Sequence, residues 1–299
     1  MTDKMYTNTN TARSFSDKWT NNPNLAFDET LREGSDIFNW ILNRNGFKDG
    51  NELKDYLKSK KRILDAGCGN GRVTALLHRY ANIHSEVVGI DLVSSEIARE
   101  NLKQLANVKI YSKDLLDNLT DLGKFDFIYS QEVLHHTKDP HKAFENLLNL
   151  LSEDGEIAIY VYKIKAPIRE YTDDFVRNAI INLPYEEAME VCRKITDLGK
   201  SLSSLNIKIK TPSISILDIQ EGEYDIQRFI YHFFMKCFWN KDLTFEDNAA
   251  INYDWYHPQD CSRHSVEEIR SWFRKAGLKI NHEMVDYYGI TVRGKKLKL

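Results

Sequence analysis

Residues 61–74 read KRILDAGCGNGRVT, and this stretch decides the fold. A short apolar run ends at Asp65, and three glycines at alternate positions, Gly67, Gly69 and Gly71, lead into a pattern of helical period. A strand, a glycine turn and a helix in this order predict the first unit of a doubly wound sheet, in which backbone amides meet a ligand. Glycines suit such a turn because a side chain would hold the ligand away and because some positions need a positive φ.

The same alternation of short apolar runs and helical patterns continues along the chain. We expect strands at 62–65, 86–90, 108–112, 125–130, 156–162, 278–285 and 289–292. We expect helices at 35–42, 51–57, 72–80, 94–105, 140–151 and 265–276. Strands that alternate with helices pair in parallel and are covered on both faces. The predicted fold class is therefore α/β, with a doubly wound, mostly parallel sheet of seven strands.

The alternation of strand and helix patterns stops between the fifth and sixth expected strands. Residues 164–264 carry helical signatures and many aromatic side chains but no clear strand alternation. We interpret them as an inserted helical cap or substrate region, placed over the carboxyl ends of the strands. The run at 229–239 is interpreted as an amphipathic helix of this cap, in preference to a membrane contact. The sheet domain then comprises residues 61–163 and 265–299.

Composition excludes several classes of protein. The 44 acidic and 41 basic residues nearly balance, so no net field favours nucleic acid or an anionic membrane as a partner. The sequence has neither the apolar core of a signal peptide nor a run long enough to span a membrane, which predicts a cytoplasmic protein. Four scattered cysteines without a Cys-x-x-Cys pair fit a reducing compartment and argue against structural zinc. A homodimer is an open alternative.

Two readings compete for the ligand of the glycine turn. A dinucleotide fingerprint is G-x-G-x-x-G, whereas the third glycine here comes one residue early. Asp65 also stands two residues before the first glycine. A carboxylate facing the turn would repel a pyrophosphate, but it suits a cationic ligand that bears an ammonium and a sulfonium centre.

DAGCGNG at 65–71 resembles the first motif of class I S-adenosylmethionine (SAM)-dependent methyltransferases, and later motifs follow in that family's order. The resemblance implies the Rossmann-like methyltransferase fold and SAM as cofactor. It implies that Asp91, which ends VVGIDL, receives the ribose hydroxyls, although Asp91 could instead cap the next helix. Asp114 would accept from the adenine amine while Leu115 packs on the ring. The implied cofactor-binding residues are Asp65, Gly67, Cys68, Gly69, Asp91, Leu92, Asp114, Leu115, Ser130 and Arg13.

The resemblance extends to a bacterial subgroup associated with surface-polysaccharide and secondary-metabolite gene clusters. It rests on TARSFSDKWT at 11–20, YDWYHPQDCSRHSVEEIRSWFRKAGL at 253–278 and GITVRGKK at 289–296. In that subgroup the amino-terminal segment folds over the cofactor. Residues 1–60 are therefore expected to cover the site, with Arg13, Phe15 and Trp19 closing it. Burial preferences alone fit packing of the two aromatic residues on the sheet equally well.

The segment FDFIYSQEVLHHTKDP, at 125–140, resembles the motif whose end faces the transferable methyl group. His135 or His136 would then serve as general base, because histidine has an ordinary pKa of about 6.5. The alternative is a shape-filling or helix-capping role. A metal site built from these histidines with Asp139 and His141 is set aside, because no coordinating spacing stands out.

We expect a methyltransferase that acts on a small polar acceptor, most simply a hydroxyl of a sugar or secondary metabolite. Aromatic rings with polar tips suit such an acceptor, although they also fill cores. The candidate substrate-binding residues are Trp255, Tyr256, His257 and His264. Two alternatives stay open: an N- or C-methyltransferase acting on tRNA or another metabolite, and a SAM-binding regulatory protein without turnover.

Overall fold

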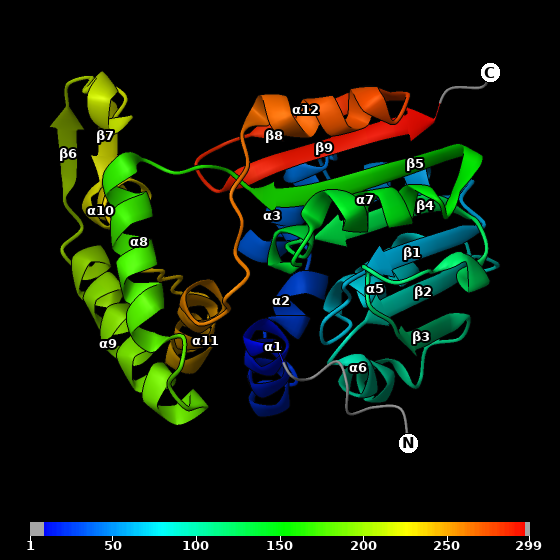
Figure 1. The fold of residues 1–299 in the computed structure, drawn as a ribbon, viewed down its shortest axis with the longest axis horizontal. Coiled ribbons are helices and arrows are strands. Elements are labelled where there is room, and N and C mark those ends of the chain that lie inside the picture. The colour runs from blue at the N-terminus through cyan, green and yellow to red at the C-terminus, as the bar shows by residue number, and fades with distance from the viewer. Residues whose placement is uncertain (1–8, 297–299) are drawn as a thin grey trace. The chain divides into compact units, whose positions relative to one another are not determined.

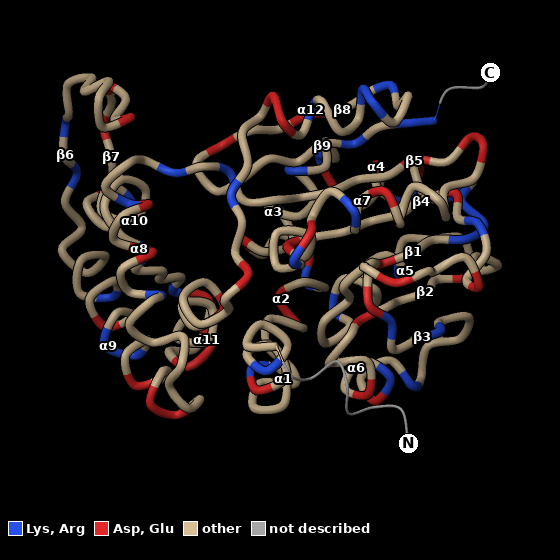
Figure 2. Tube along the Cα trace, in the orientation of Figure 1, with Lys and Arg blue, Asp and Glu red and all other residues tan. Residues whose placement is uncertain are grey.

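The computed structural model describes residues 9–296, which form two compact units. We call residues 23–163 and 260–296 the sheet unit, and residues 9–22 and 164–259 the helical unit. Residues 23–60, which we had grouped with the amino-terminal segment, pack within the sheet unit. Acidic and basic positions are interspersed along the chain (Figure 2).

The sheet unit contains one seven-stranded sheet in the order β3-β2-β1-β4-β5-β9-β8 (Figure 1). The first five strands of this order are parallel, and β9 runs antiparallel to both β5 and β8. The expected doubly wound, mostly parallel sheet is confirmed. The strands are β1 (Arg62–Ala66), β2 (Glu86–Asp91), β3 (Val108–Ser112), β4 (Phe125–Gln131), β5 (Leu151–Tyr162), β8 (Leu278–Val285) and β9 (Gly289–Lys296).

Helices cover both faces of this sheet because successive strand residues point to opposite sides. Leu64 packs in one apolar cluster with Phe144 of α7 and Phe273 of α12, whereas its neighbour Ile63 packs in another with Leu76 of α5. The helices of the unit are α2 (Phe27–Leu31), α3 (Asp36–Arg44), α4 (Gly50–Leu57), α5 (Arg72–Tyr80), α6 (Ser95–Leu102), α7 (Pro140–Leu148) and α12 (Val266–Lys275). Short 3-10 turns are η1 (Thr120–Leu122) and η2 (Leu134–His136).

The helical unit is built from α1 (Asn10–Asn21), α8 (Pro167–Ile180), α9 (Tyr185–Ser204), α10 (Ile226–Phe233) and α11 (Phe245–Tyr256). It also contains a hairpin of β6 (Lys208–Thr211) and β7 (Gly222–Asp225), with η3 (Ser215–Leu217) between them. We expected no strands here, and that expectation is wrong. Each strand has four residues and carries no apolar run, so periodicity gives almost no signal.

One strand boundary also differs from the expectation. Helix α7 ends at Leu148 and β5 begins at Leu151, five residues earlier than expected. The polar residues SEDG at 152–155 read as a turn, but the pairing of β4 with β5 shifts register between Phe125 and Phe127 and accommodates them within the strand. Within residues 9–296 we find no helix with the length and apolarity that crossing a bilayer requires.

Candidate functional site

The order of the strands places the topological switch point, where a crevice is expected, between β1 and β4. From β1 the chain proceeds to one side of the sheet through β2 and β3, and from β4 it proceeds to the other side through β5. Ligands of doubly wound sheets bind at such a switch point, outside the carboxyl ends of the strands. The glycine turn follows β1, Asp91 ends β2, Asp114 follows β3 and Gln131 ends β4, so all four stand at this edge.

Backbone hydrogen bonds hold the glycine turn against the end of β2. The amides of Gly67 and Cys68 both donate to the carbonyl oxygen of Ile90, at 2.8 and 2.9 Å. The amide of Gly69 donates to Oδ2 of Asp91 at 3.0 Å. The φ angles of Gly67, Gly69 and Gly71 are 86°, 56° and 89°, a region that favours glycine. The turn is therefore fixed by the neighbouring strand.

Close packing gives a second reason for two of these glycines. A Cβ atom on Gly67 would lie 2.3 and 2.4 Å from the two methyl carbons of Val133. A Cβ atom on Gly71 would lie 2.7 Å from Cδ1 of Leu102. The sequence predicts these glycines from the approach of a ligand and from a need for positive φ, and the φ angles confirm the second reason. At Gly67 and Gly71 the protein itself also excludes a side chain. At Gly69, the approach of a ligand remains the proposed reason for the absence of a side chain.

Asp91 is tied to the backbone by both carboxylate oxygens. Oδ1 accepts from the amides of Val93 and Ser94, each at 2.9 Å, and Oδ2 accepts from Gly69. These bonds form a turn that precedes α6; the N-cap of that helix is Ser94, so Asp91 does not itself cap it. A carboxylate offers about four acceptor positions, so three backbone bonds leave room for one more. Holding this turn and binding a ligand are compatible at this residue.

Asp65 is buried at the end of β1, with 1% of its surface exposed. Its Oδ2 accepts a hydrogen bond of 2.6 Å from Thr74 Oγ1 of α5. Burial raises the pKa of Asp65 from 3.8 to about 7, while the hydroxyl of Thr74 and the charge of Arg72 oppose that rise. The carboxyl therefore titrates near neutral pH, where a nearby cation would favour its ionised form.

The raised pKa predicts how stability depends on pH. Because the folded chain holds the proton of Asp65 more tightly than the unfolded chain, the free energy of unfolding falls as pH rises from about 4 to 7, by up to about 1.4 kcal/mol per unit. Urea unfolding at pH 5 and 6.5 should show a loss about 2 kcal/mol larger in the native protein than in Asp65→Asn. Equal losses in both proteins would contradict this account.

The remaining expected cofactor residues of the sheet unit differ in exposure. Asp114 is half-buried and its Oδ1 accepts from the amide of Leu116 at 2.9 Å, whereas Leu115 is buried in the apolar cluster beside β1. Leu92 is half-buried in the turn after β2. Ser130 is fully buried and donates to the carbonyl oxygen of Ala66 at 3.0 Å, which joins the ends of β4 and β1.

Cys68 is buried in a small cluster with Ala98 and Leu102 of α6 and Ile110 of β3. Burial raises the pKa of its thiol well above the ordinary value. The side chain therefore acts as a small apolar group at this position, and only its backbone takes part in the turn.

The two histidines of η2 lie just beyond β4. The ring of His135 is fully buried and stacks on Tyr162 of β5, with centroids 3.6 Å apart. Its backbone carbonyl accepts from the amide of Ser262 at 2.8 Å. His136 is half-buried, and its Nδ1 lies 2.8 Å from the carbonyl oxygen of Asp260. The structure therefore brings His135 to the crevice edge of the sheet as an ordered, packed ring.

Gln131 is a residue that the sequence analysis missed. It is 7% exposed, and its Oε1 accepts from the hydroxyl of Tyr129 at 2.6 Å, which in turn accepts from Asn45 Nδ2 at 3.0 Å. Its buried Nε2 makes no hydrogen bond with any residue in the part of the chain described. An unpartnered buried donor is unusual in a native structure, and here it ends the strand that borders the crevice.

Glu132, which follows, is one of few non-glycine residues with positive φ, at 59°. Its Oε2 lies 3.8 Å from Nη2 of Arg72, at the start of α5. Strained backbone of this kind concentrates at functional sites. The available signal in the sequence was the polar pair Gln131 and Glu132 directly after an apolar strand.

Arg13 does not belong to the sheet unit. It lies on α1 of the helical unit and is exposed. His264 lies in the sheet unit, where its Nε2 is 2.9 Å from Ser262 Oγ and its Nδ1 is 3.0 Å from Glu268 Oε1. The structure thus assigns these two expected ligand-binding residues to different units.

The other three expected substrate residues, Trp255, Tyr256 and His257, are buried inside the helical unit. His257 is fully enclosed: its Nε2 lies 3.1 Å from the carbonyl oxygen of Leu183, and its Nδ1 lies 2.7 Å from Ser14 Oγ. Nε2 must donate to the carbonyl, so Nδ1 accepts, and burial lowers the pKa of the ring. Within the helical unit, these three side chains therefore make the contacts and hydrogen bonds of packed interior residues.

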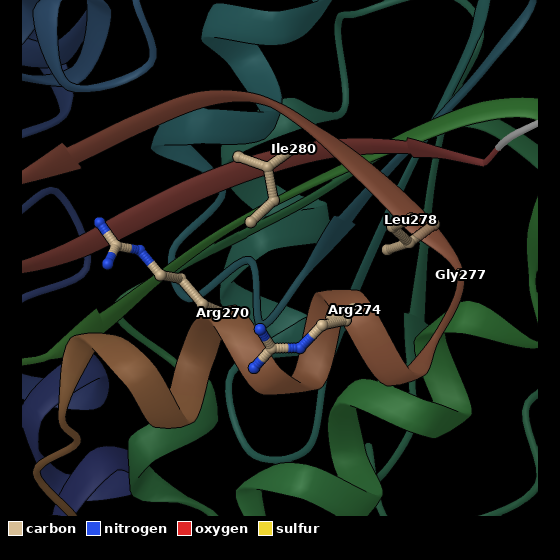
Figure 3. Close-up of a pocket in the computed structure, with 5 residues that line it drawn as sticks. All are labelled: Arg270, Arg274, Gly277, Leu278 and Ile280. Carbon is tan, nitrogen blue, oxygen red and sulfur yellow. The ribbon is translucent and has the colours of Figure 1, made fainter.

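A separate surface hollow lies between α12 and β8 (Figure 3). Arg270, Arg274, Gly277, Leu278 and Ile280 line it. Leu278 pairs with Lys296 at the end of β9 that faces the start of β5, so the hollow is at the opposite edge from the glycine turn. Among residues 9–296, no three His, Cys, Asp or Glu side chains gather as a metal site.

The profile of a family described as "Methyltransferase domain" matches residues 57–227. A ubiquinone biosynthesis O-methyltransferase of Glaesserella parasuis is 36% identical over 107 residues, covering 33% of this chain and 44% of that protein. A juvenile hormone acid O-methyltransferase of Bombyx mori is 30% identical over 125 residues, covering 40% and 45%. The matches therefore span less than half the length of these curated relatives.

Among solved structures, a SAM-dependent methyltransferase from Aquifex aeolicus aligns with 83% of this chain and 90% of its own. The two are 15% identical, with a TM-score of 0.43.

Proposed function

The chain belongs to the methyltransferase-domain family. From this premise we propose that it is a SAM-dependent methyltransferase that methylates a hydroxyl of a small polar molecule. The acceptor class we favour is a sugar or secondary metabolite. The names of the curated relatives, which are O-methyltransferases of small molecules, support oxygen as the methylated atom.

The observation that carries the proposal is the set of polar groups at the carboxyl edge of β1, β2, β3 and β4. Asp65, Asp91 and Asp114 end or follow three adjacent parallel strands. A nucleoside that carries ammonium and sulfonium charges fits carboxylates, whereas a pyrophosphate would be repelled. The unpartnered Nε2 of Gln131 adds a donor at the fourth strand. The residues present therefore suit the cofactor.

We assign roles to these residues by their position along the edge. Asp91 receives a ribose hydroxyl at its one remaining acceptor position, and Asp114 receives the adenine amine. Gly69 lets the cofactor approach the turn, and Asp65 favours the positively charged end of the cofactor. Bound SAM supplies an electrophilic methyl group on a sulfonium.

The protein's own contribution is positioning and proton removal. Holding two reactants in near-attack geometry contributes roughly 7 to 11 kcal/mol, more than a general base does. We assign His135 as the base that would take the proton of the acceptor hydroxyl. Its stacking on Tyr162 fixes the ring, and His136 lies beside it with centroids 4.4 Å apart.

Asp91→Ala should weaken binding of S-adenosylhomocysteine by about 5- to 150-fold, which is roughly 1 to 3 kcal/mol, because a ribose hydroxyl loses its acceptor. Isothermal calorimetry gives the affinity directly. Since Asp91 also holds the turn before α6, Asp91→Asn is measured alongside, because it keeps one acceptor oxygen for the backbone amides. Asp121→Ala is the matched control and should bind normally. It removes an exposed acid of η1 that pairs with Lys113. Unchanged affinity in both Asp91 variants would refute the assignment.

The acceptor class is tested with SAM labelled in its methyl group. Purified protein is incubated with a cell extract separated into small-molecule and RNA fractions, and the labelled product is then located. Label in the small-molecule fraction, in a product whose methyl group resides on oxygen, supports the proposal. Label in RNA, or on nitrogen or carbon, contradicts it.

A further inference from the structure

A cationic cluster lies inside the helical unit, between the start of α8 and the length of α10 from Arg228 to His232. Arg228 and His232 are one turn apart on α10, and Lys165 and Arg169 stand just before and within the first turn of α8. The lysine and arginine positions of these segments are blue in Figure 2. Arg169 donates from Nη1 to the carbonyl oxygen of Tyr231, which joins the two helices. The cluster is therefore one ordered feature of a single unit.

The nearby acid Asp173 is fully engaged. Its Oδ2 accepts from Arg169 Nε at 2.9 Å and Trp255 Nε1 at 2.8 Å. Its Oδ1 accepts from the Tyr256 hydroxyl at 2.9 Å and the amide of Lys236 at 3.0 Å. Four bonds use the acceptor positions of a carboxylate. Asp173 thus compensates Arg169 and has no acceptor position left for another cation.

Arg228 is the cation without such compensation. Its Nη2 donates to the carbonyl oxygen of Trp239 at 3.3 Å, but its buried Nη1 has no hydrogen-bond partner within the described residues. Arg228 forms no ion pair with any residue of the described part of the chain. Its guanidinium lies over the rings of Tyr231 and Phe238, at 5.5 and 6.0 Å. A buried unpartnered donor costs about 1–3 kcal/mol, and a guanidinium does not lose its charge.

One oxygen of the acid nearest in sequence is also engaged. Asp225 caps α10, and its Oδ1 accepts from the backbone amides of Gln227 and Arg228, at 2.9 and 3.2 Å. On the α8 side, Glu170 Oε1 accepts from the amide of Lys165 at 2.6 Å.

The pKa of His232 responds to the burial of the ring and to the charges around it. It is 9% exposed, and its pKa is lowered to about 3, first by burial and then by Arg169, Arg228 and Lys165. The imidazole is therefore neutral at physiological pH. Shared rings place the cations near one another: Arg169 and Arg228 both lie over Tyr231, and Lys165 and Arg169 both lie over Trp255. An anion beside Arg228 would be attracted.

We propose that this cluster binds an oxyanion, a carboxylate or phosphate group of a small molecule, through the fork of Arg228, with Arg169 and Lys165 supplying further positive charge. A guanidinium offers parallel N–H donors that match two oxygens of such a group. The further statement that this molecule is the methyl acceptor, and hence that the acceptor is acidic, rests on the proposed function. Anion binding itself does not.

The test is anion binding to the full chain. Inorganic phosphate and sodium succinate are each titrated against sodium chloride of equal ionic strength, with the thermal unfolding midpoint and calorimetry as readouts. We expect phosphate or succinate to raise the midpoint above the chloride baseline, and the stronger of the two identifies the anion class. Arg228→Gln should bind that anion at least tenfold more weakly, and Arg228→Lys, which keeps the charge but loses the fork, should lie between.

Arg193→Gln is the matched control, because Arg193 is an exposed arginine of α9 paired with Glu246, and it should bind like the native protein. Failure of both anions to exceed chloride, or native binding by both Arg228 variants, would overturn the proposal. S-adenosylhomocysteine affinity is measured on the same samples. If the native protein does not bind S-adenosylhomocysteine, that result counts against the proposed function alone. If it does not bind either anion, that result counts against this inference alone.

Discussion

Gly67→Ala is expected to lower the free energy of unfolding by about 2–5 kcal/mol. The left-handed conformation, with φ of 86°, costs an alanine roughly 1–2 kcal/mol, and overpacking adds about 1–3 kcal/mol. The clash is with Val133, whose branched methyl carbons would stand 2.3 and 2.4 Å from the new Cβ atom. Urea unfolding followed by circular dichroism measures the change.

Two controls separate the causes of this loss. Gly34 has φ of 85°, and no other group lies within 4 Å of the position that an alanine Cβ would take, so Gly34→Ala isolates the backbone cost. It should destabilise by only the roughly 1–2 kcal/mol of the backbone term. Val133→Ala should recover part of the loss when combined with Gly67→Ala, because it removes the two clashing methyl groups. Equal effects of Gly34→Ala and Gly67→Ala, with no recovery, would show that packing against Val133 does not require this glycine.

His135→Phe is expected to lower turnover by about 10²- to 10⁴-fold, the usual contribution of a positioned general base. Phenylalanine preserves a flat ring against Tyr162 but cannot accept a proton. S-adenosylhomocysteine affinity should stay within about twofold of the native value, because the proposed role concerns the acceptor and not the cofactor. The comparison is made from the steady-state rates at which the two proteins form the methylated product identified in the label-transfer experiment.

His141→Phe is the matched control for this variant. His141 is a partly exposed histidine at the start of α7, 3.7 Å from Glu145, and it should tolerate the change. Full turnover in His135→Phe would favour the shape-filling alternative and end the assignment of His135 as base. A similar loss in both variants would point to a general effect on the fold.

The sheet could be predicted because its signal is local. Buried parallel strands such as 62–65 and 86–90 are short apolar runs between turns, and the structure places β1 and β2 there. The hairpin of β6 and β7 could not be predicted, because its strands are short and mostly polar. The start of β5 was hidden by four polar residues that a shift in register accommodates.

The candidate site could be located but not fully explained from the sequence. Motif order indicated which residues stand at the crevice, since carboxyl ends of parallel strands share one edge. Sequence could not show that Gly67 is required by Val133, which is 66 positions away, or that Gln131 keeps a buried donor without a partner among the described residues. Nor could it show that Trp255 and Tyr256 bond to Asp173, because such contacts depend on tertiary packing.

The central claim is that the glycine turn and the acids of β1, β2 and β3 hold a positively charged sulfur nucleoside. Calorimetric titration of the native protein with S-adenosylhomocysteine and SAM, repeated in the presence of NADH, tests it most directly. The account predicts that one molecule of either sulfur nucleoside binds per chain and that NADH does not compete. Preference for NADH, or failure to bind both sulfur nucleosides, would contradict it.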